Sequence, residues 1–383
     1  MSLKVAMIGP FPERIGVITG GVEGVVHCLT VGLRRVADLE LHILAPAYHR
    51  PAGTEERDGM TIHWLKVPFP PFLTNWSVFR RRVHLHLADI RPDIAHFQGV
   101  ASWLLNYRGP CVLTIHGIYE RDLLYRGGRL TSLRRSVVAL SERWGRERSP
   151  HTIVISPYVL DEIGNQVRGR RWHIENPVTH SFFEVERERA GQRVLFVGRI
   201  CPRKNVDGLL RAFSKVQEIL PDATLHIAGT SESAEYEEAC RRFVAEERLS
   251  DAVKFLGNVN RLELLRELSE AACLALVSHQ ETAPLIVEEA MAAGVPVLVS
   301  RICGLPYMVE EGRTGYLVDQ MNEGEIVERL VNLLEDDEAN QAMGERCRKV
   351  ARERFHADTV AEKTLEVYRE ILGCPAPCPV NPC

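Results

Sequence analysis

The chain has 383 residues, more than one ordinary hydrophobic core accommodates, and this length fits two domains of typical size. Hydrophobic residues make up 45% of the sequence and charged residues 26%, which describes a globular protein and argues against long disordered stretches. The net charge of −4 is unevenly divided: residues 1–181 carry +7 and residues 182–383 carry −11, which predicts two domains with different partners.

The first half of the sequence alternates apolar strand-like runs with helical stretches. The first strand is expected at residues 4–9 and the first helix at residues 22–36. Further strands are expected at residues 39–46, 60–67, 93–99, 111–117 and 152–156. Runs rich in Val, Ile and Leu, with amphipathic helices between them, are typical of a buried parallel sheet with helices on both faces.

The second half repeats this pattern. Strands are expected at residues 193–198, 223–229, 253–259, 273–278, 296–300 and 315–318, with helices such as 206–220 and 261–272 between them. The sequence therefore predicts an α/β protein with two doubly wound domains, residues 1–181 and 193–355. Residues 182–192 are charged and lack an apolar period, which predicts a linker. A helix at residues 356–373 is expected to pack back on the N-terminal domain.

The termini and the cysteines bear on the cellular compartment. No apolar run approaches the roughly 20 residues of a spanning helix, and the N-terminus has no signal-peptide pattern, so a cytoplasmic protein is expected. The isolated cysteines lie within apolar or mixed stretches, which predicts buried reduced thiols. Cys374, Cys378 and Cys383 lack a paired histidine, which favours a disordered tail at residues 374–383 over a metal site.

Functional residues are expected after strands, because ligands of open α/β sheets bind beyond the carboxyl ends of the strands. After the first strand, about eleven residues separate Gly9 from Gly20 and Gly21, so the G-x-G-x-x-G spacing of nicotinamide-binding proteins is absent. A Gly-Gly pair at a helix N-terminus still lets backbone amides approach an anion. A simple flexible turn is the alternative.

Two histidines end neighbouring strands. His116, in the run TIHG, precedes a glycine, and an imidazole there can donate or accept a hydrogen bond near neutral pH. His96, in DIAHFQG, occupies the same kind of position on the preceding strand and has the weaker case for function. A structural role is the alternative for both.

Cations follow the strand expected at residues 193–198. Arg199 offers a rigid fork that matches phosphate oxygens, and Lys204 adds a mobile point charge, so the two are expected to bind a diphosphate without a metal ion. A charged surface loop is the alternative. Selection of a nucleotide base is expected from backbone groups after another strand, around Gly257.

Residues 278–318 carry the strongest signal, two glutamates in an E-x7-E spacing. Pro284 is placed as the first helical residue before Leu285, with Glu281 just outside the helix and Glu289 inside it. Eight helical residues span about 12 Å, too far for the pair of a retaining hydrolase, which needs roughly 5 Å. The spacing suits carboxylates that grip hydroxyls at opposite ends of one ligand, with helix amides at phosphates between them. Three further glutamates are expected to be solvated: Glu288, Glu310 and Glu311.

At this point the sequence resembles the retaining GT-B glycosyltransferases of glycosyltransferase family 4. The similar motifs follow the family's order over nearly the whole chain: GGVEGVVHCLTVGL, TIHG, VISPYVLDEI, IENPV, VLFVGRICPRKNVDGLLRAF, LHIAG, VKFLGNV, the E-x7-E segment and GLPYMVEEGRTGYLV. The resemblance implies two Rossmann-like domains that face a central cleft. It also implies that the C-terminal domain binds a nucleotide-diphospho-sugar and the N-terminal domain binds the acceptor.

The resemblance also implies roles for the candidate residues. Such enzymes look independent of metal ions, because cations and a helix dipole stabilise the leaving group. Attack from the leaving group's own face requires no protein nucleophile. The implied roles are Arg199 and Lys204 at the diphosphate, Glu281 at the transferred sugar, Glu289 at the ribose, Gly20, Gly21 and the start of the helix at Leu285 near the phosphates, and His116 beside the anomeric carbon.

Two positions depart from the family's pattern. The run Thr282-Ala283-Pro284 stands where Gly-Phe-Gly is common, which puts the choice of sugar in doubt. Asn205 follows Lys204 where glycine is common. Neither departure removes a charged group that the mechanism needs.

The N-terminal half mixes aromatic and basic residues over residues 64–87, and residues 125–148 are also strongly basic. This combination suits an anionic membrane surface, on the inner face of the membrane, from which a lipid-linked acceptor could be reached. A solvated helix face with core aromatics is the alternative. No nucleic-acid recognition pattern is present. The residues concerned are Trp64, Phe69, Phe72, Trp76, Phe79, Arg80, Arg81 and Arg82.

The predicted function is therefore transfer of a hexose from a UDP- or GDP-sugar to a hydroxyl of a glycan or lipid-linked acceptor. The donor is a co-substrate, and no cofactor or metal is expected. Two alternatives stay open on the same scaffold: a nucleotide-sugar 2-epimerase, which needs carboxylates placed for proton abstraction, and a catalytically silent binding protein.

Overall fold

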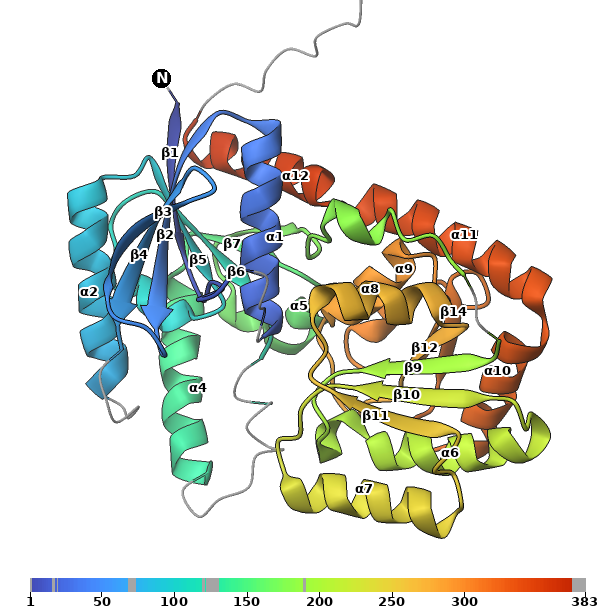
Figure 1. The fold of residues 1–383 in the computed structure, drawn as a ribbon. Coiled ribbons are helices and arrows are strands. Elements are labelled where there is room, and N and C mark those ends of the chain that lie inside the picture. The colour runs from blue at the N-terminus through green and yellow to red at the C-terminus, as the bar shows by residue number, and fades with distance from the viewer. Residues whose placement is uncertain are drawn as a thin grey trace, which may run out of the picture. The chain divides into compact units, whose positions relative to one another are not determined.

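The computed structural model describes residues 2–15, 18, 20–67, 74–118, 121, 131–188 and 191–373. The chain divides into two compact units (Figure 1). Unit 1 consists of Met1–Pro177 and Ala357–Cys383, and unit 2 consists of Val178–His356. Each unit contains one sheet with its own hydrophobic core, which confirms the expected α/β fold with two Rossmann-like, parallel-sheet domains.

The sheet of unit 1 has the strand order β3-β4-β2-β1-β5-β6-β7-β8. All neighbouring strands are parallel except β3 and β4, which form an antiparallel hairpin through Asp58 and Gly59, both at positive φ. The strand order reverses between β1 and β5, which makes this the point where a doubly wound sheet binds ligands. The strands are β1 (Leu3–Ile8), β2 (Leu39–Ala47), β3 (Gly53–Arg57), β4 (Met60–Lys66), β5 (Ile94–Gln98), β6 (Cys111–Ile115), β7 (His151–Val154) and β8 (Arg170–His173).

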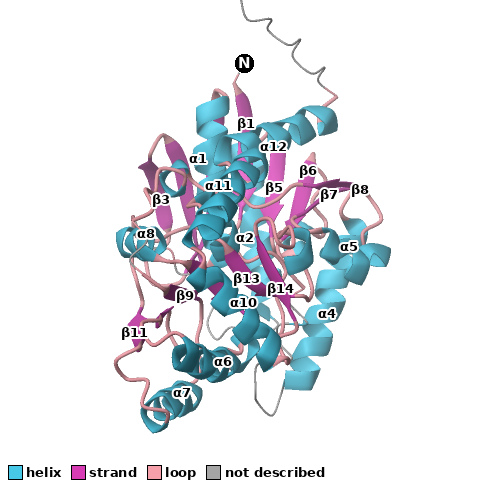
Figure 2. Ribbon diagram, turned by 90° about the vertical axis from the view of Figure 1, so that its right-hand side faces the viewer, coloured by secondary structure: helices cyan, strands magenta, loops and turns pink. Residues whose placement is uncertain are grey.

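The helices of unit 1 include one from the end of the chain. Helix α12 (Ala357–Ile371) packs against α1 (Gly21–Val36), and the two lie side by side in Figures 1 and 2. The approach is so close that a Cβ atom at Gly32 would overlap the carbonyl of Ala357. The other helices are α2 (Thr74–Ile90), α4 (Thr131–Arg148), α5 (Pro157–Ile163) and the 3-10 turns η1 (Ala101–Leu104) and η3 (Gly164–Gln166).

The sheet of unit 2 is entirely parallel, in the order β11-β10-β9-β12-β13-β14. Its order reverses between β9 and β12, so the carboxyl ends of these two strands mark the expected ligand position of this unit. The strands are β9 (Arg193–Val197), β10 (Thr224–Ala228), β11 (Val253–Gly257), β12 (Cys273–Leu276), β13 (Val297–Ser300) and β14 (Gly315–Val318).

Helices of unit 2 connect these strands, and Figure 1 labels α6 to α11 beside them. The helices are α6 (Val206–Ile219), α7 (Ala234–Glu246), α8 (Arg261–Glu270), α9 (Leu285–Ala292), α10 (Glu323–Glu335) and α11 (Asp337–Arg354), with the 3-10 turns η4 (His180–Phe182), η5 (Pro202–Lys204) and η6 (Leu305–Tyr307). Among the described residues, none of the helices combines the length and apolar character required to cross a membrane.

The unit boundaries differ from the expected ones at the linker. Residues 182–192 were expected to be a linker, but their described part belongs to unit 2, because Phe182, Phe183 and Val185 are buried in its core. The charged residues Glu184, Glu186, Arg187 and Glu188 give this segment a polar character in the sequence. The expected helix at residues 356–373 is α12, which belongs to unit 1, and residues 374–383 lie outside the described part of the chain. Of the isolated cysteines, Cys303 is partly buried and the others are buried free thiols.

Candidate functional site

Three glycines close the carboxyl ends of β9, β10 and β11. The Gly198 N–H donates to the carbonyl of Ala228 at 2.9 Å, and the Gly229 N–H donates to the carbonyl of Gly257 at 2.7 Å. Gly229 has φ +141°, and a Cβ atom there would overlap the carbonyl oxygen of Gly198. These close backbone contacts fix the position of the backbone at Gly198. They therefore also fix where the next residue begins, the predicted phosphate ligand Arg199.

Arg199 is half exposed and bonded to a carboxylate that the sequence did not single out. Its Nη1 donates to Oε1 of Glu232 at 2.6 Å, from the loop between β10 and α7. The side chains of Arg199 and Glu232 keep 52% and 32% of their surfaces exposed, so the pair is weak and water can replace either partner. Arg199 therefore lies where a larger anion could displace Glu232.

Lys204 and Glu281 meet at the switch point of unit 2. Turn η5 follows β9 and carries Lys204, whereas Glu281 follows β12, so neighbouring strands deliver the two residues. Both are buried, and Lys204 Nζ donates to Glu281 Oε1. Ser278 Oγ donates to the same oxygen at 2.9 Å, and Arg203 Nη1 lies 3.7 Å from Glu281 Oε2. The carboxylate is therefore surrounded by donors, which compensate its buried charge.

The residue after Lys204 explains one departure from the family's pattern. Asn205 has φ +52°, the left-handed region that glycine favours and asparagine tolerates. Its side-chain amide donates to the carbonyl of Val277 at 3.0 Å. Asn205 thus supplies the backbone geometry of a glycine and ties η5 to the end of β12, which holds Lys204 near Glu281.

The two glutamates of the E-x7-E spacing lie at and inside α9. Helix α9 begins at Leu285 with Pro284 as its N-cap, one residue later than expected. Glu289 is partly exposed, yet burial raises its pKa to about 7, against the opposing influence of Arg261. Glu288, expected to be solvated, is 1% exposed; its position in α9 turns it into the unit 2 core rather than to solvent. Gly257, at the end of β11, has φ +68°, and a Cβ atom there would meet nothing within 4 Å.

The remaining predicted residues belong to unit 1. Gly20 is the N-cap of α1, and a Cβ atom at Gly20 or Gly21 would meet nothing within 4 Å. The fold therefore does not require glycine at these positions, and the space beside them is open. His116 follows β6, and its Nε2 lies 2.6 Å from Oε1 of Gln98. Burial lowers the pKa of His116 to about 4, so the ring is neutral at pH 7. His96 is fully buried, which supports its structural alternative.

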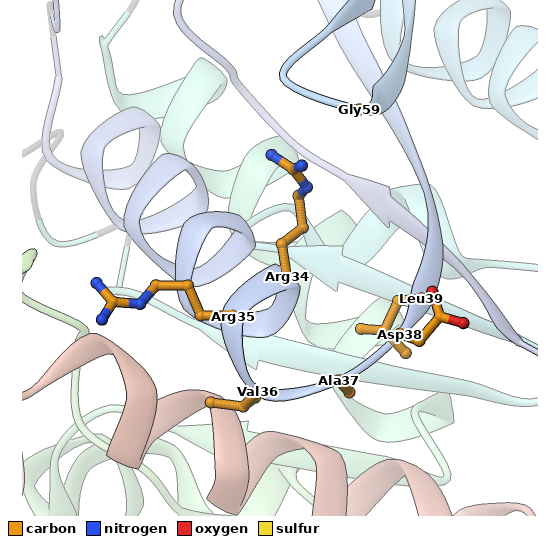
Figure 3. Close-up of a pocket in the computed structure, with 7 residues that line it drawn as sticks. All are labelled: Arg34, Arg35, Val36, Ala37, Asp38, Leu39 and Gly59. Atoms are coloured by element: carbon orange, nitrogen blue, oxygen red, sulfur yellow. The ribbon is translucent and has the colours of Figure 1, made fainter.

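Two pockets outside this constellation contain none of the predicted site residues. In unit 1, a pocket of about 590 Å³ lies where α1 ends and β2 begins, and Figure 3 shows Arg34 and Arg35 in it, pointing in different directions. In unit 2, a pocket of about 440 Å³ is lined in part by Arg187, Gly294 and Asn340. The unit 1 pocket is at the amino ends of strands, opposite the edge where such sheets bind ligands. In the described residues, no group of three or more His, Cys, Asp or Glu side chains is arranged to hold a metal ion.

Comparison with known proteins decides the family. The family model of glycosyl transferases group 1 matches residues 179–350, and that of glycosyltransferase family 4 matches residues 19–182. The chain belongs to the GT-B glycosyltransferases of family 4. This family-4 glycosyltransferase is 25% identical over 304 residues to the N-acetyl-alpha-D-glucosaminyl L-malate synthase of Bacillus anthracis, covering 76% of this chain and 74% of that protein.

Solved structures share the fold of this glycosyltransferase. Sucrose-phosphate synthase from Thermosynechococcus elongatus superposes with a TM-score of 0.82 at 19% identity, over 97% of this chain and 99% of that one. Anabaena HepE in complex with UDP-glucose superposes with a TM-score of 0.73 at 16% identity, over 96% and 100% of the two chains. The residues that sequence reasoning missed in this glycosyltransferase are Ser278, Glu232 and Gln98. Ser278 and Gln98 each sit at or just past a strand end, the signal that could have found them.

Proposed function

We propose that the protein is a retaining, metal-independent glycosyltransferase that moves a hexose from a UDP- or GDP-sugar to a hydroxyl acceptor in glycan or glycolipid synthesis. One observation carries the proposal: Lys204, Glu281 and the start of α9 meet at the switch point of unit 2. A cation, a carboxylate and a helix N-terminus together complement a sugar diphosphate. The fold neighbour HepE, whose structure contains UDP-glucose, supports a donor of this class.

Donor binding would replace the carboxylate partner of each cation with the diphosphate of the donor. A diphosphate at Arg199 and Lys204 replaces Glu232 and Glu281 as the counter-ion of each cation. Glu281, released from Lys204, then accepts hydrogen bonds from the hydroxyls of the transferred sugar. Glu289 accepts from the ribose, and the amides at the start of α9 face the phosphates. The same cations stabilise the diphosphate as the glycosidic bond breaks, which is their contribution to the rate.

Retention follows from attack on the face that the diphosphate leaves. The acceptor oxygen forms the new bond to the anomeric carbon as the bond to the diphosphate breaks, so no side chain has to act as a nucleophile. The departing phosphate accepts the proton of the acceptor hydroxyl, so no side chain has to act as a general base. The ring of His116 is neutral at pH 7, so it would lie beside the anomeric carbon without donating a charge-neutralising proton there.

Incubation with a panel of UDP-, GDP- and ADP-sugars tests the function. We expect release of nucleoside diphosphate that depends on an acceptor hydroxyl, with the anomeric configuration of the sugar kept and no effect of EDTA. A change of the sugar in the absence of acceptor would establish the epimerase instead. Absence of turnover and of donor binding across the panel would contradict both enzymes.

Arg199→Ala tests the phosphate site. Loss of one or two hydrogen bonds to a charged group costs roughly 1.5–3 kcal/mol each, so donor affinity should fall at least about tenfold by calorimetry. Arg211→Ala is the matched control, because Arg211 is also half exposed and paired with a carboxylate, Asp207, at 2.9 Å. Equal donor affinity of Arg199→Ala and the control would remove Arg199 from the site.

The acceptor side is proposed to include an anionic membrane surface, on which helix α2 would lie. Val78, Arg81 and Leu85 share one face of this helix and are exposed, whereas Phe79 and Val83 are buried beneath it. Arg82 donates to the carbonyl of Lys66, so Arg81 is the most available of the three arginines. Of the aromatic residues expected at this surface, Trp64 and Phe79 are buried core residues, so they are not available to a membrane. The aromatic residues 69 and 72 lie outside the described residues, as does the side chain of residue 76.

Co-sedimentation with vesicles of anionic lipid tests this surface. We expect wild type to pellet with the vesicles, and the triple variant Arg80/Arg81/Arg82→Ala to remain in the supernatant, because each basic residue contributes about 1 kcal/mol near such a surface. Arg241/Arg242→Ala on α7 controls for the loss of positive charge elsewhere. Wild type that fails to pellet, or a triple variant that pellets equally, would contradict the proposal.

A further inference from the structure

A chain of buried polar side chains runs from α12 to His116 within unit 1. His96, on β5, lies between the hydroxyls of Tyr368 and Thr114, with Nδ1 at 2.6 Å from the first and Nε2 at 2.6 Å from the second. Gln98 faces the same side of β5, with its Nε2 at 3.1 Å from His96 Nε2 and its Oε1 at 2.6 Å from His116 Nε2. Tyr368 and His96 are fully buried, and Gln98 is 1% exposed.

The sulfur of Met7 fixes the orientation of the Gln98 amide. Nε2 of Gln98 lies 3.0 Å from Sδ of Met7, and a thioether sulfur accepts hydrogen bonds but cannot donate them. With the amide turned the other way, its oxygen would face the sulfur and two acceptors would be in contact. The amide nitrogen therefore faces Met7 and His96, and the amide oxygen faces His116.

This orientation favours one protonated ring nitrogen in each histidine. Both rings are neutral at pH 7, because burial lowers the pKa of His96 to about 3 and that of His116 to about 4. The Gln98 oxygen only accepts, so His116 donates from Nε2. The Gln98 nitrogen only donates, so His96 accepts at Nε2 and donates from Nδ1 to the Tyr368 hydroxyl.

We infer that Gln98 is a positioning residue for His116, and that the Tyr368–His96–Gln98 chain holds the His116 ring in its Nε2–H tautomer. The inference rests on the proposed role of His116 beside the anomeric carbon. It gives the last helix of the chain a part in the site, because α12 supplies the acceptor at the far end of the hydrogen-bond chain. A ring that turned over would lose the bond to Gln98.

NMR of histidine ring nitrogens in the full-length protein tests the tautomer without any donor or acceptor. With ¹⁵N-histidine labelling and assignment by His116→Gln, wild type should show His116 as the Nε2–H tautomer. Gln98→Leu should abolish that preference, because leucine offers no acceptor to Nε2–H of His116. Tyr368→Phe should weaken the preference for the Nε2–H tautomer of His116, although residue 368 does not touch His116. Thr364→Ala should leave this preference unchanged, because the Thr364 hydroxyl is bonded only within α12.

Kinetics with the donor found by the panel supply the second readout. We expect Gln98→Leu to lower kcat at least tenfold while the KM for the donor changes less than threefold, because donor contacts in unit 2 remain intact. An Nδ1–H tautomer in wild type, an unchanged tautomer in both Gln98→Leu and Tyr368→Phe, or an unchanged kcat in a variant whose tautomer has shifted would each overturn the inference. If no donor is turned over, the proposed function fails while the spectra still report on the hydrogen-bond chain.

Discussion

At the scale of single residues, the two cations that are proposed to bind the diphosphate are each paired with a carboxylate of unit 2. Arg199 is paired with Glu232 and Lys204 with Glu281, so the cations that would bind a diphosphate already have counter-ions. The two pairs differ in burial, and this difference sets the free-energy cost of replacing each carboxylate with a diphosphate. The exposed pair at Arg199 is worth little, whereas removing a partner from the buried pair at Lys204 leaves an uncompensated charge unless a ligand replaces it.

We expect the proposed contact of Glu289 with the ribose to make donor binding dependent on pH. Burial raises its pKa to about 7, so below pH 7 the carboxyl group is mostly protonated and offers a poorer acceptor to ribose hydroxyls. The affinity for a UDP-sugar should therefore rise as the pH increases from 6 to 7.5 and level off above, with a limiting slope of tenfold per pH unit. His116 titrates near pH 4 and does not contribute in this range.

Calorimetry of UDP-glucose, or of the donor that the panel identifies, measures this dependence. Glu289→Gln is the control and should bind more weakly than wild type at pH 8, with an affinity that does not vary between pH 6 and 8. The contribution of Glu289 to the stability of the free protein should move the opposite way, because the unfolded glutamate ionises above its ordinary pKa of 4.5. This contribution falls as the pH rises from 4.5 to 7 and is constant beyond, and the difference in the free energy of unfolding between wild type and Glu289→Gln isolates it from the opposite contribution of the buried histidines His96 and His116. A flat affinity profile in wild type would contradict the assignment of Glu289.

At the scale of elements, the sequence predicted the central strands better than the edge strands of the unit 1 sheet. Apolar runs identified the buried central strands, because both faces of a parallel sheet must be apolar. It did not single out β3 and β8, since Gly53–Arg57 and Arg170–His173 are polar strands at the two ends of the unit 1 sheet. The dipeptide Asp58-Gly59 is a hairpin signal that would have revealed β3.

The candidate site was predictable where its residues follow strands. Position after a strand end pointed to Arg199, Lys204 and His116, because the carboxyl ends of parallel strands share one edge of the sheet. The partners of these residues were not predictable. Glu232 lies in a loop without a motif, and the contact between His96 and Tyr368 joins residues 272 positions apart. Only the folded chain brings such pairs together.

The contact between α1 and α12 yields a prediction at this scale. Gly32→Ala should destabilise the protein by about 1–3 kcal/mol, because the added methyl group would overlap the carbonyl of Ala357 and force the helices apart. Thermal unfolding should show a melting temperature lower by several degrees. The same change at Gly324, on α10, is the control: its nearest contact would be 3.6 Å away, so helix propensity alone should apply and stability should rise or stay level. Equal melting temperatures of Gly32→Ala and wild type would contradict the close packing.

At the scale of the whole molecule, the chain enters and leaves unit 2 at neighbouring points. It passes from unit 1 to unit 2 after Pro177 and returns after His356. Inside unit 2 these two ends are joined, because the Val178 N–H donates to the carbonyl of Phe355 at 2.7 Å. Unit 2 is therefore an insertion into unit 1, with both of its ends at one place, the arrangement that domain insertion tolerates.

The return of the chain has a consequence for synthesis. When residue 177 has emerged from the ribosome, α12 has not yet been translated. This is the helix that packs against Gly32 and carries Tyr368, whose hydroxyl contacts His96. The surface of unit 1 that α12 covers therefore stays exposed while some 180 further residues, those of unit 2, are synthesised. Unit 1 therefore reaches its full packing only after α12 has been synthesised.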